Sequence, residues 1–286
     1  MSASLSAAFH SAPSRTLMAC GRALTLGPKA LVMGILNVTP DSFSDGGCSF
    51  AVEDALANAQ RMAAEGADIL DIGGESTRPG HTPLSTEEEW ARLAPVMAVL
   101  PQHSSLPISI DSYKAAVARR ALETGACIVN DVWGFSRDPE MAHVVADFDA
   151  AAIIMHNREQ IDPALDIVDD MRAFFDRTIA QAERAGVQRE RLVLDPGIGF
   201  GKSLEQNLDA IRRLGELRVL GLPILLGTSR KSFISKLVES SPEQRLPGTI
   251  ASNVIGLMAG VEIIRVHDVA AHIQAARITE AIRDVS

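Results

Sequence analysis

Polar side chains follow several short apolar runs in this sequence, at the point where each run ends. Asp111, Asn130 and Asp195 each follow such a run. A partly buried carboxylate needs hydrogen-bond donors, because its burial otherwise costs free energy. A planar heterocycle whose edge carries two N–H groups would supply those donors, and an asparagine offers a donor and an acceptor to the rest of the ring. Asp195 alone would be interpreted as the cap of the turn that follows it. Beside Asp111 it is better explained as a ligand-binding residue.

Cationic groups follow the last two apolar runs. The stretch GTSRKS at 227–232 precedes a helix-like segment, and the free N–H groups of a helix N-terminus attract anions. Arg265 and His267 are two residues apart, so they share one face of a strand. Alternatively, Arg265 forms a surface ion pair and His267 starts a helix. Together with Lys231 and Arg78, however, they predict an anion site on an acidic protein.

Two other interpretations concern lysines. The stretch GFGK at 199–202 lacks the spacing G-x-x-x-x-G-K-[ST], so we reject a phosphate-binding loop of that type. Lys231 could form a Schiff base with a carbonyl substrate if burial depressed its pKa, which the sequence alone leaves open.

The elements that must position these groups alternate along the chain. Helix-like stretches include 52–64, 86–99, 114–123, 166–185 and 204–214, and Gly125, Gly186, Gly221 and Gly260 occur where C-cap glycines are expected. The apolar runs of strand length are 31–36, 67–72, 107–110, 126–129, 151–155, 191–194, 223–226 and 261–266. This alternation predicts an α/β fold with a single (β/α)₈ barrel, and a doubly wound open sheet is the alternative. In a barrel, all eight strand ends meet at the face where barrel enzymes keep their active sites.

Composition excludes several classes of protein. The 286 residues are 47% hydrophobic and carry a net charge of −9, which disfavours nucleic acid as a partner. No apolar run approaches the length of a membrane span. The three cysteines have no metal-like spacing, which favours a reducing, cytoplasmic location.

The first residues form a separate segment. No acidic residue precedes Asp41, whereas Arg15, Arg22 and Lys29 are present. An organelle-targeting peptide can have this composition. We favour a disordered tail over residues 1–18, followed by one domain over 19–286.

Seven motifs together resemble the dihydropteroate synthase family, in that family's order. They are MGILNVTPDSFSDGG, DILDIGGESTRPG, ISIDS, VNDV, LDPGIGFGK, GTSRKSF and EIIRVHDV. The resemblance extends from about residue 20 to the C-terminus. It implies a (β/α)₈ enzyme of folate synthesis that joins p-aminobenzoate to 6-hydroxymethyl-7,8-dihydropterin diphosphate with Mg²⁺. It also implies a homodimer and a target of sulfonamides.

The resemblance implies roles for particular residues. The pterin would be held by Asp111, Asn130, Met155, Asp195, Phe200 and Lys231. The diphosphate would be bound by Asn37, Arg265 and His267, with Asn37 also a ligand of the metal. p-Aminobenzoate would be surrounded by Phe43, Thr77, Arg78, Pro79 and Ser232. Catalysis would depend on Asp45, Asp111, Asp195 and Lys231.

By the same resemblance, the segment 37–47 would be a loop that closes over the reactants and excludes water. Departure of diphosphate would leave a cation that the aromatic amine attacks, and Asp45 would stabilise that cation. The sequence departs from the family at Ile198, where an aromatic residue is usual, and at MHN 155–157, so His156 is given no role.

Two alternatives remain at this stage. A methyltetrahydrofolate–corrinoid methyltransferase is also a pterin-binding barrel, but it has no use for the diphosphate residues. A pterin-binding paralogue without catalysis would retain the motifs. Formation of dihydropteroate from the two substrates would distinguish both alternatives from a synthase.

Overall fold

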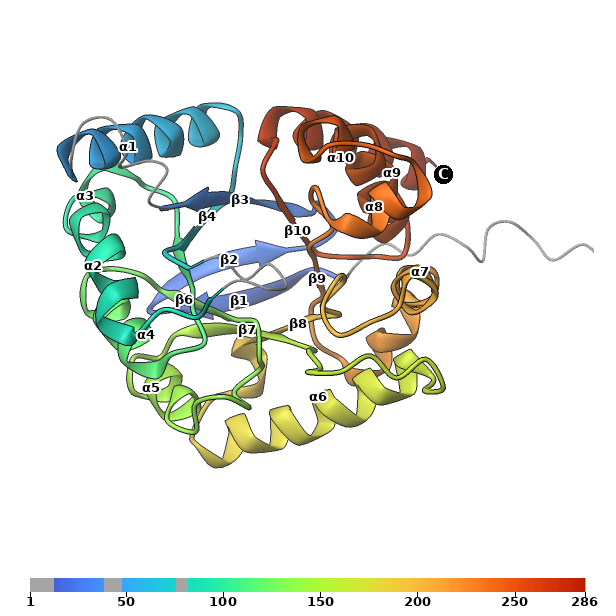
Figure 1. Ribbon diagram of the computed structural model, residues 1–286, viewed down its shortest axis with the longest axis horizontal. Helices are drawn as coiled ribbons and strands as arrows, with labels where there is room; N and C mark the ends of the chain where they lie inside the picture. Colours follow the sequence, from blue (N-terminus) through green and yellow to red (C-terminus); the bar gives the residue numbers. More distant parts are fainter. Residues whose placement is uncertain (1–12, 39–47, 76–81, 286) are drawn as a thin grey trace, which may run out of the picture.

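The computed structural model describes residues 13–38, 48–75 and 82–285, and it contains the expected barrel (Figure 1). The strands are β3 (Leu31–Asn37), β4 (Ile69–Gly73), β5 (Ile108–Asp111), β6 (Ile128–Asp131), β7 (Ala151–Met155), β8 (Leu192–Asp195), β9 (Leu225–Leu226) and β10 (Ile263–Val266). All pair in parallel in the order β8-β7-β6-β5-β4-β3-β10-β9. A parallel bridge between Leu194 and Ile224 joins the two ends of this sheet, so the ring is closed.

Helices surround the strands in Figure 1, as expected for this fold. They are α1 (Cys48–Ala64), α2 (Thr86–Met97), α3 (Leu100–His103), α4 (Ala115–Glu123), α5 (Met141–Asp147), α6 (Ile167–Arg184), α7 (Leu204–Arg212), α8 (Ser232–Leu237), α9 (Leu246–Met258) and α10 (Val269–Arg283), with the short 3₁₀ helices η3 (Arg189–Arg191), η4 (Leu214–Leu220) and η5 (Pro242–Arg245). The helix expected over 86–99 is confirmed as α2, and Ser85 is its N-cap. The Ser85 side chain accepts a hydrogen bond from the Glu88 amide, and the Glu88 side chain accepts one from the Ser85 amide. Within the described residues, no helix has the length and apolar character needed to cross a membrane.

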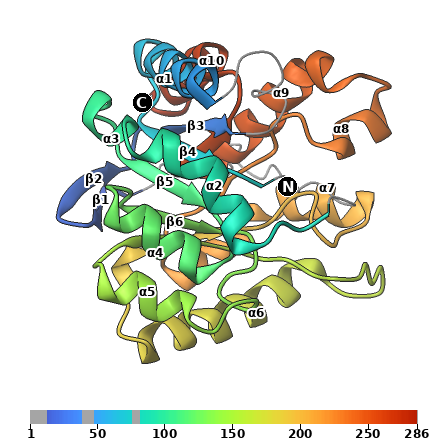
Figure 2. The same cartoon turned by 60° about the vertical axis from the view of Figure 1, so that its left-hand side comes forward.

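A β-hairpin at the amino end of the chain was not predicted. It consists of β1 (Arg15–Ala19) and β2 (Arg22–Leu26), and Figure 2 shows it at one end of the barrel, with the arrow of β3 pointing away from it. Leu17 and Leu26 are fully buried against the first inward-facing residues of the barrel strands. The hairpin therefore closes the lower end of the barrel. It begins at Arg15, ahead of the boundary expected after residue 18, so residues 15–18 form a strand rather than part of a tail.

Inward-facing residues form layers along the barrel axis. On β4 the inward residues are Ile69 and then Asp71, and on β10 they are Ile263 and then Arg265, because alternate residues of a strand share a face. The lower layer is apolar and packs on the hairpin. The upper layer, toward the carboxyl ends of the strands, is polar. The polar layer is where the strand-end residues meet.

Candidate active site

A buried charge network crosses the upper layer of the barrel. The Arg265 guanidinium pairs with two carboxylates, Nε with Asp71 Oδ2 at 2.6 Å and Nη2 with Asp111 Oδ2 at 2.6 Å. Asn130 Nδ2 donates a hydrogen bond of 3.1 Å to the same Asp71 oxygen. The alternative of a surface ion pair for Arg265 is therefore wrong, since both carboxylates are buried.

Asp71, the third residue of β4, was not among the predicted site residues. It is fully buried and links Asn130 to Arg265, so it holds two of the predicted site residues in place. The signal that could have found it is its spacing. Asp71 lies two residues after Ile69, which puts a carboxylate on the inner face of a strand.

The two buried carboxylates keep acceptor capacity. Asp71 Oδ1 and Asp111 Oδ1 are buried and accept no hydrogen bond from the described residues. Most buried polar atoms in proteins have a hydrogen-bond partner, so these oxygens are suited to N–H groups of a ligand. Burial raises the pKa of Asp111 to about 7, although the attraction of Arg265 opposes this shift.

Asp195 lies beside Lys231 at the carboxyl end of β8. Its Oδ1 accepts a hydrogen bond of 2.7 Å from the Gly197 amide, so the turn-cap interpretation is correct for one oxygen. The other oxygen faces Gly227. A Cβ atom placed on Gly227 would lie 3.9 Å from Asp195 Oδ2, from Lys231 Nζ and from Arg265 Cβ alike. Three charged residues therefore converge around one glycine.

Burial also changes the acidity of this pair. It raises the pKa of Asp195, against the attraction of Lys231, and it lowers the pKa of Lys231 to about 8. Lys231 Nζ donates to the Ile198 carbonyl and lies 4.6 Å from the centroid of the Phe200 ring, a cation–π geometry. A carbonyl and an aromatic ring hold Lys231, which gives this lysine a binding role that needs no Schiff base.

Met155 completes this side of the site. It is buried at the end of β7 and is paired in register with Asp195 on β8. The six residues predicted to bind a pterin thus lie on four neighbouring strand ends and the loops that follow β8 and β9.

The predicted anion residues lie on β3 and β10, which are neighbours in the barrel. His267 Nδ1 lies 2.9 Å from Ser229 Oγ, and this hydroxyl also accepts a hydrogen bond from the His267 amide. Ser229 was not predicted to belong to the site. Asn37 is exposed at the end of β3, and Ser232 is exposed at the first position of α8.

Five predicted site residues lie outside the described part of the chain. They are Phe43, Asp45, Thr77, Arg78 and Pro79. The chain reaches them from the carboxyl ends of β3 and β4, which are paired neighbours. His156, which was given no role, is buried beneath the site, and its Nε2 lies 3.0 Å from Asp170 Oδ2.

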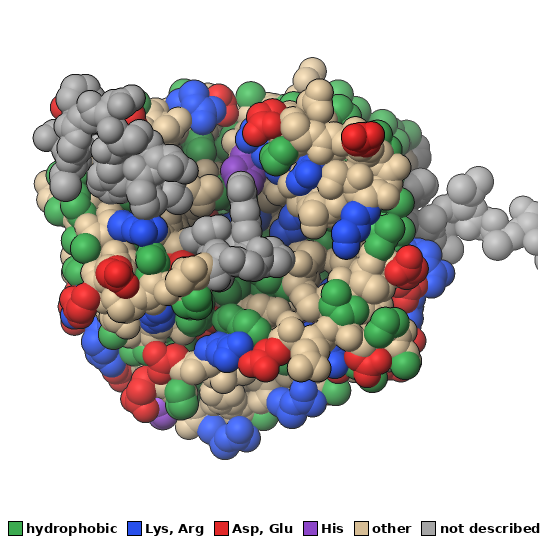
Figure 3. All heavy atoms as spheres, viewed as in Figure 1, with side chains coloured by type: hydrophobic (Ala, Val, Ile, Leu, Met, Phe, Trp, Pro, Cys, Tyr) green, Lys and Arg blue, Asp and Glu red, His purple; other side chains and the backbone are tan. Residues whose placement is uncertain are grey.

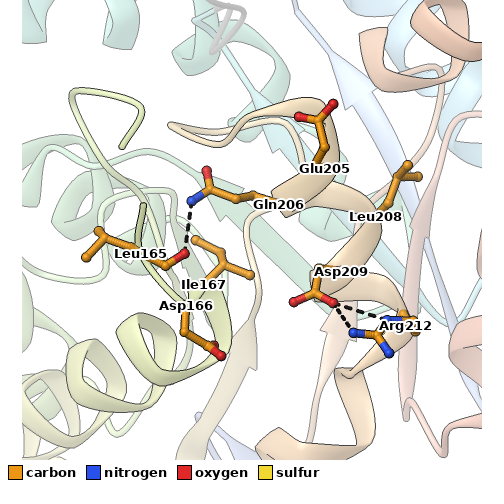
Figure 4. A pocket seen from close by; sticks show the side chains of 8 residues that line it. All are labelled: Leu165, Asp166, Ile167, Glu205, Gln206, Leu208, Asp209 and Arg212. Atoms are coloured by element: carbon orange, nitrogen blue, oxygen red, sulfur yellow. Dashed lines mark hydrogen bonds and ion pairs between the residues drawn. The ribbon is translucent and has the colours of Figure 1, made fainter. Parts of the chain in front are cut away.

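Two hollows are candidates for the active site, the recess in the barrel mouth and a hollow at the side of it. Figure 3 shows Lys and Arg side chains and a His gathered beside a recess near the middle of the face. The other hollow lies at the starts of α6 and α7 and is drawn in Figure 4. There Asp209 is paired with Arg212, and Asp166 with Arg213. Three of its four charged lining residues, Asp166, Asp209 and Arg212, are already in ion pairs within the protein, so we place the active site in the barrel mouth.

Comparisons with known proteins bear on this placement. The family described as "Pterin binding enzyme" matches residues 33–267, which span β3 to the residue after β10. The chain belongs to this family. A dihydropteroate synthase of Clostridium beijerinckii is 45% identical over 258 residues, which cover 90% of this chain and 96% of the relative.

Solved structures give the same result. A dihydropteroate synthase from Clostridium difficile, solved in the presence of pteroic acid, has a TM-score of 0.87 and 51% identity, and the match covers 90% of this chain and 98% of that one. A dihydropteroate synthase from Xanthomonas albilineans, solved with 4-aminobenzoic acid, has a TM-score of 0.90 and 43% identity, with 96% and 100% covered. The resemblance inferred from the motifs and the single-domain barrel are both confirmed.

Proposed function

We propose that this protein is a dihydropteroate synthase, a transferase that condenses 6-hydroxymethyl-7,8-dihydropterin diphosphate with p-aminobenzoate. The products are 7,8-dihydropteroate and diphosphate. One observation carries the proposal beyond family membership. Buried carboxylates with free acceptor oxygens and the cations Lys231 and Arg265 lie together in one barrel mouth, which suits a substrate with an N–H-rich ring and an anionic leaving group.

In this proposal, hydrogen-bond acceptors bind the N–H edge of the pterin, and the Phe200 ring packs against the pterin ring. Asp111 and Asp195 accept its N–H groups, and Asn130, whose Nδ2 is engaged with Asp71, presents its amide oxygen. Phe200 and Met155 contribute apolar contact. Lys231 lies between Phe200 and Asp195, where it can donate to a ring oxygen or nitrogen.

The leaving diphosphate binds at Arg265 and His267. Mg²⁺ typically keeps several waters and binds few protein ligands beside substrate phosphates. Asn37, exposed at the end of β3, offers one amide oxygen, which fits a metal that takes most of its ligands from water and phosphate. When bound, Mg²⁺ would supply charge to the departing diphosphate.

We propose a dissociative route for the bond that breaks. The C–O bond to diphosphate breaks with its electron pair leaving on oxygen, and the amine of p-aminobenzoate then attacks the carbon and loses a proton. Fixed carboxylates near the pterin ring favour the cationic intermediate, because preorganised charges in a water-poor site act without reorganisation. Asp45 and the p-aminobenzoate residues belong to this proposal from their sequence motifs.

Two further proposals concern the assembly and the location of the protein. A homodimer is supported by Ile255 on α9 and by Ile278 and Ile282 on α10, which are exposed large apolar side chains on adjacent helices. Sedimentation velocity tests it, and a monomer at all concentrations would contradict it.

A cytoplasmic location is supported by the cysteine pattern and is tested by cell fractionation.

The decisive test is an assay with both substrates. Purified protein, 6-hydroxymethyl-7,8-dihydropterin diphosphate, p-aminobenzoate and Mg²⁺ should yield equal amounts of dihydropteroate and diphosphate. A protein that binds the pterin but forms no dihydropteroate would support the non-catalytic alternative and overturn the proposal. Methyl transfer from methyltetrahydrofolate to a corrinoid would support the methyltransferase instead.

A further inference from the structure

Lys202 is a buried cation that the function described above does not use. Its side chain is 4% exposed, and its Nζ donates to three backbone carbonyls, those of Gly197 at 2.8 Å, Phe200 at 3.0 Å and His156 at 3.3 Å. Three acceptors match the three N–H groups of an ammonium. None of the salt bridges within the described residues involves Lys202. Burial lowers the pKa of Lys202 to about 7, and the attraction of Asp195 opposes this shift.

The three carbonyls belong to two different loops of the barrel mouth. His156 lies in the loop after β7, whereas Gly197 and Phe200 lie in the loop after β8. The two backbones meet so closely that a Cβ on Gly197 would lie 1.9 Å from the His156 oxygen, and one on Gly201 would lie 2.3 Å from the Arg158 oxygen. Both glycines have positive φ, so no other residue fits this junction without strain.

The far side of the β8 loop is anchored to α7. The Gly199 amide donates a hydrogen bond of 2.6 Å to Asn207 Oδ1, and Asn207 Nδ2 donates to the Ser203 carbonyl at 2.7 Å. The loop is therefore held from α7 at one side and from the β7 loop, through Lys202, at the other.

This loop presents two groups to the active site. Its Ile198 carbonyl accepts a hydrogen bond from Lys231 Nζ, and its Phe200 ring lies 4.6 Å from the same nitrogen. Any shift of the loop therefore moves the partners of Lys231, and with them the separation of Lys231 from Asp195.

We propose that Lys202 is a positioning residue for the pterin subsite, joining the loops after β7 and β8 so that Ile198 and Phe200 orient Lys231 against Asp195. The proposal rests on the proposed function, because it assigns the pterin to this subsite. Lys202 touches no substrate in it. It acts through the loop, and its charge also attracts Asp195 and so opposes the rise in the pKa of that carboxyl.

The anion side of the site provides an internal reference. Arg265 is fixed by Asp71 and Asp111, and His267 by Ser229, so none of these contacts passes through the β8 loop. Loss of Lys202 should therefore weaken pterin binding and leave diphosphate binding unchanged. A general loss of structure would weaken both.

The test compares three variants with the wild type. Lys202→Met has a side chain of similar length but lacks all three N–H donors, and Lys202→Gln keeps two neutral N–H donors. Lys236→Met changes an exposed lysine on α8 and is the matched control. Calorimetric titrations with 6-hydroxymethyl-7,8-dihydropterin and, separately, with inorganic diphosphate and Mg²⁺ measure the two affinities.

The expected result is graded. Lys202→Met should raise the pterin Kd about tenfold or more, because several buried carbonyls lose their donor. Lys202→Gln should raise it less, and Lys236→Met should leave it at the wild-type value. The diphosphate Kd should stay within about twofold in all three, since its contacts lie elsewhere. Wild-type pterin affinity in a folded Lys202→Met protein, or equal losses for both ligands, would overturn the proposal.

If Lys202→Met does not fold, Lys202→Gln decides the question by the same two titrations, and unchanged pterin affinity in it counts against the proposal. The wild-type titration separates this outcome from failure of the proposed function. A wild-type protein that binds no pterin would overturn the function itself, whichever result the variants give.

Discussion

Individual residues in the barrel mouth each serve more than one partner. Asp195 accepts from the Gly197 amide through one oxygen and faces Lys231 through the other. Arg265 holds two carboxylates and is also the predicted diphosphate ligand. Substitutions should therefore be chosen to remove one contact while keeping the other.

The first prediction concerns Asp195. Asp195→Asn retains an oxygen for the Gly197 amide but loses the charged acceptor that faces the pterin. Pterin binding should weaken by roughly 1.5–3 kcal/mol, the usual contribution of a hydrogen bond to a charged group. Calorimetry measures the change, and thermal unfolding checks that the variant is folded. An unchanged affinity would remove Asp195 from the pterin subsite.

The second prediction is a pH dependence. Only an ionised Asp111 accepts N–H groups through both oxygens, and burial raises the pKa of this carboxyl to about 7 in the free protein. A raised pKa means that the group is protonated below that pH, so pterin affinity should increase as the pH rises through about 7. Asp111→Asn should flatten the profile. A wild-type affinity that is constant across this range would contradict the assignment.

A second buried network, of ion pairs and a hydrogen bond, joins α2 and the start of α4 to the segment after β4. Lys114, just before α4, bridges Glu89 of α2 at 2.5 Å and also pairs with Glu75, which follows β4. Tyr113 Oη donates to Glu75 at 2.9 Å. The network ties two helices to the strand from which the chain leads to Thr77, Arg78 and Pro79.

The third prediction tests this network. Lys114→Met removes the ammonium from two carboxylates whose side chains are only 3% and 1% exposed. Removing one partner of a buried ion pair is strongly destabilising, so unfolding should become easier by about 3 kcal/mol. Arg119→Met is the control. It breaks a pair with Asp147 whose side chains are 42% and 54% exposed, and should cost less than about 1 kcal/mol. Equal effects in urea unfolding would mean that the network adds no stability.

At the scale of the whole molecule, the apolar residues that stabilise the fold and the charged residues proposed to bind ligands occupy opposite ends of the barrel. The β1–β2 hairpin and the apolar layer fill the lower end, whereas the charged residues occupy the upper end. A ligand that binds only the folded barrel should stabilise the whole domain, because the site is built from strands far apart in the sequence.

The fourth prediction follows from this linkage. Inorganic diphosphate with Mg²⁺ should raise the melting temperature, with a stabilisation of about 2.7 kcal/mol when the ligand is present at a hundred times its Kd. Each variant is compared with its own ligand-free melting temperature, so that intrinsic destabilisation cancels. Arg265→Gln should lose most of this increment. Full protection in Arg265→Gln would place the anion site elsewhere.

The sequence by itself determined the alternation of elements, the residues at the strand ends and the family. These features are local. An apolar run of four to six residues is enough to predict a strand, and motifs such as GTSRKSF are contiguous. The prediction of eight strands, a helix over 86–99 and convergence of Asp111, Asn130, Asp195 and Lys231 needed no knowledge of packing. Their roles toward pterin, diphosphate and p-aminobenzoate remain predictions.

Only the tertiary structure decided which groups meet. Asp71 and Arg265 are 194 residues apart and become partners because β10 pairs with β3, which pairs with β4. The hairpin was missed because its five-residue strands alternate weakly and gain their burial only from the barrel floor. Lys202 looked like part of a failed phosphate motif, and its true partners are carbonyls, one of them 46 residues away. Hydrogen bonds of this kind depend on closure of the ring, which no local pattern encodes.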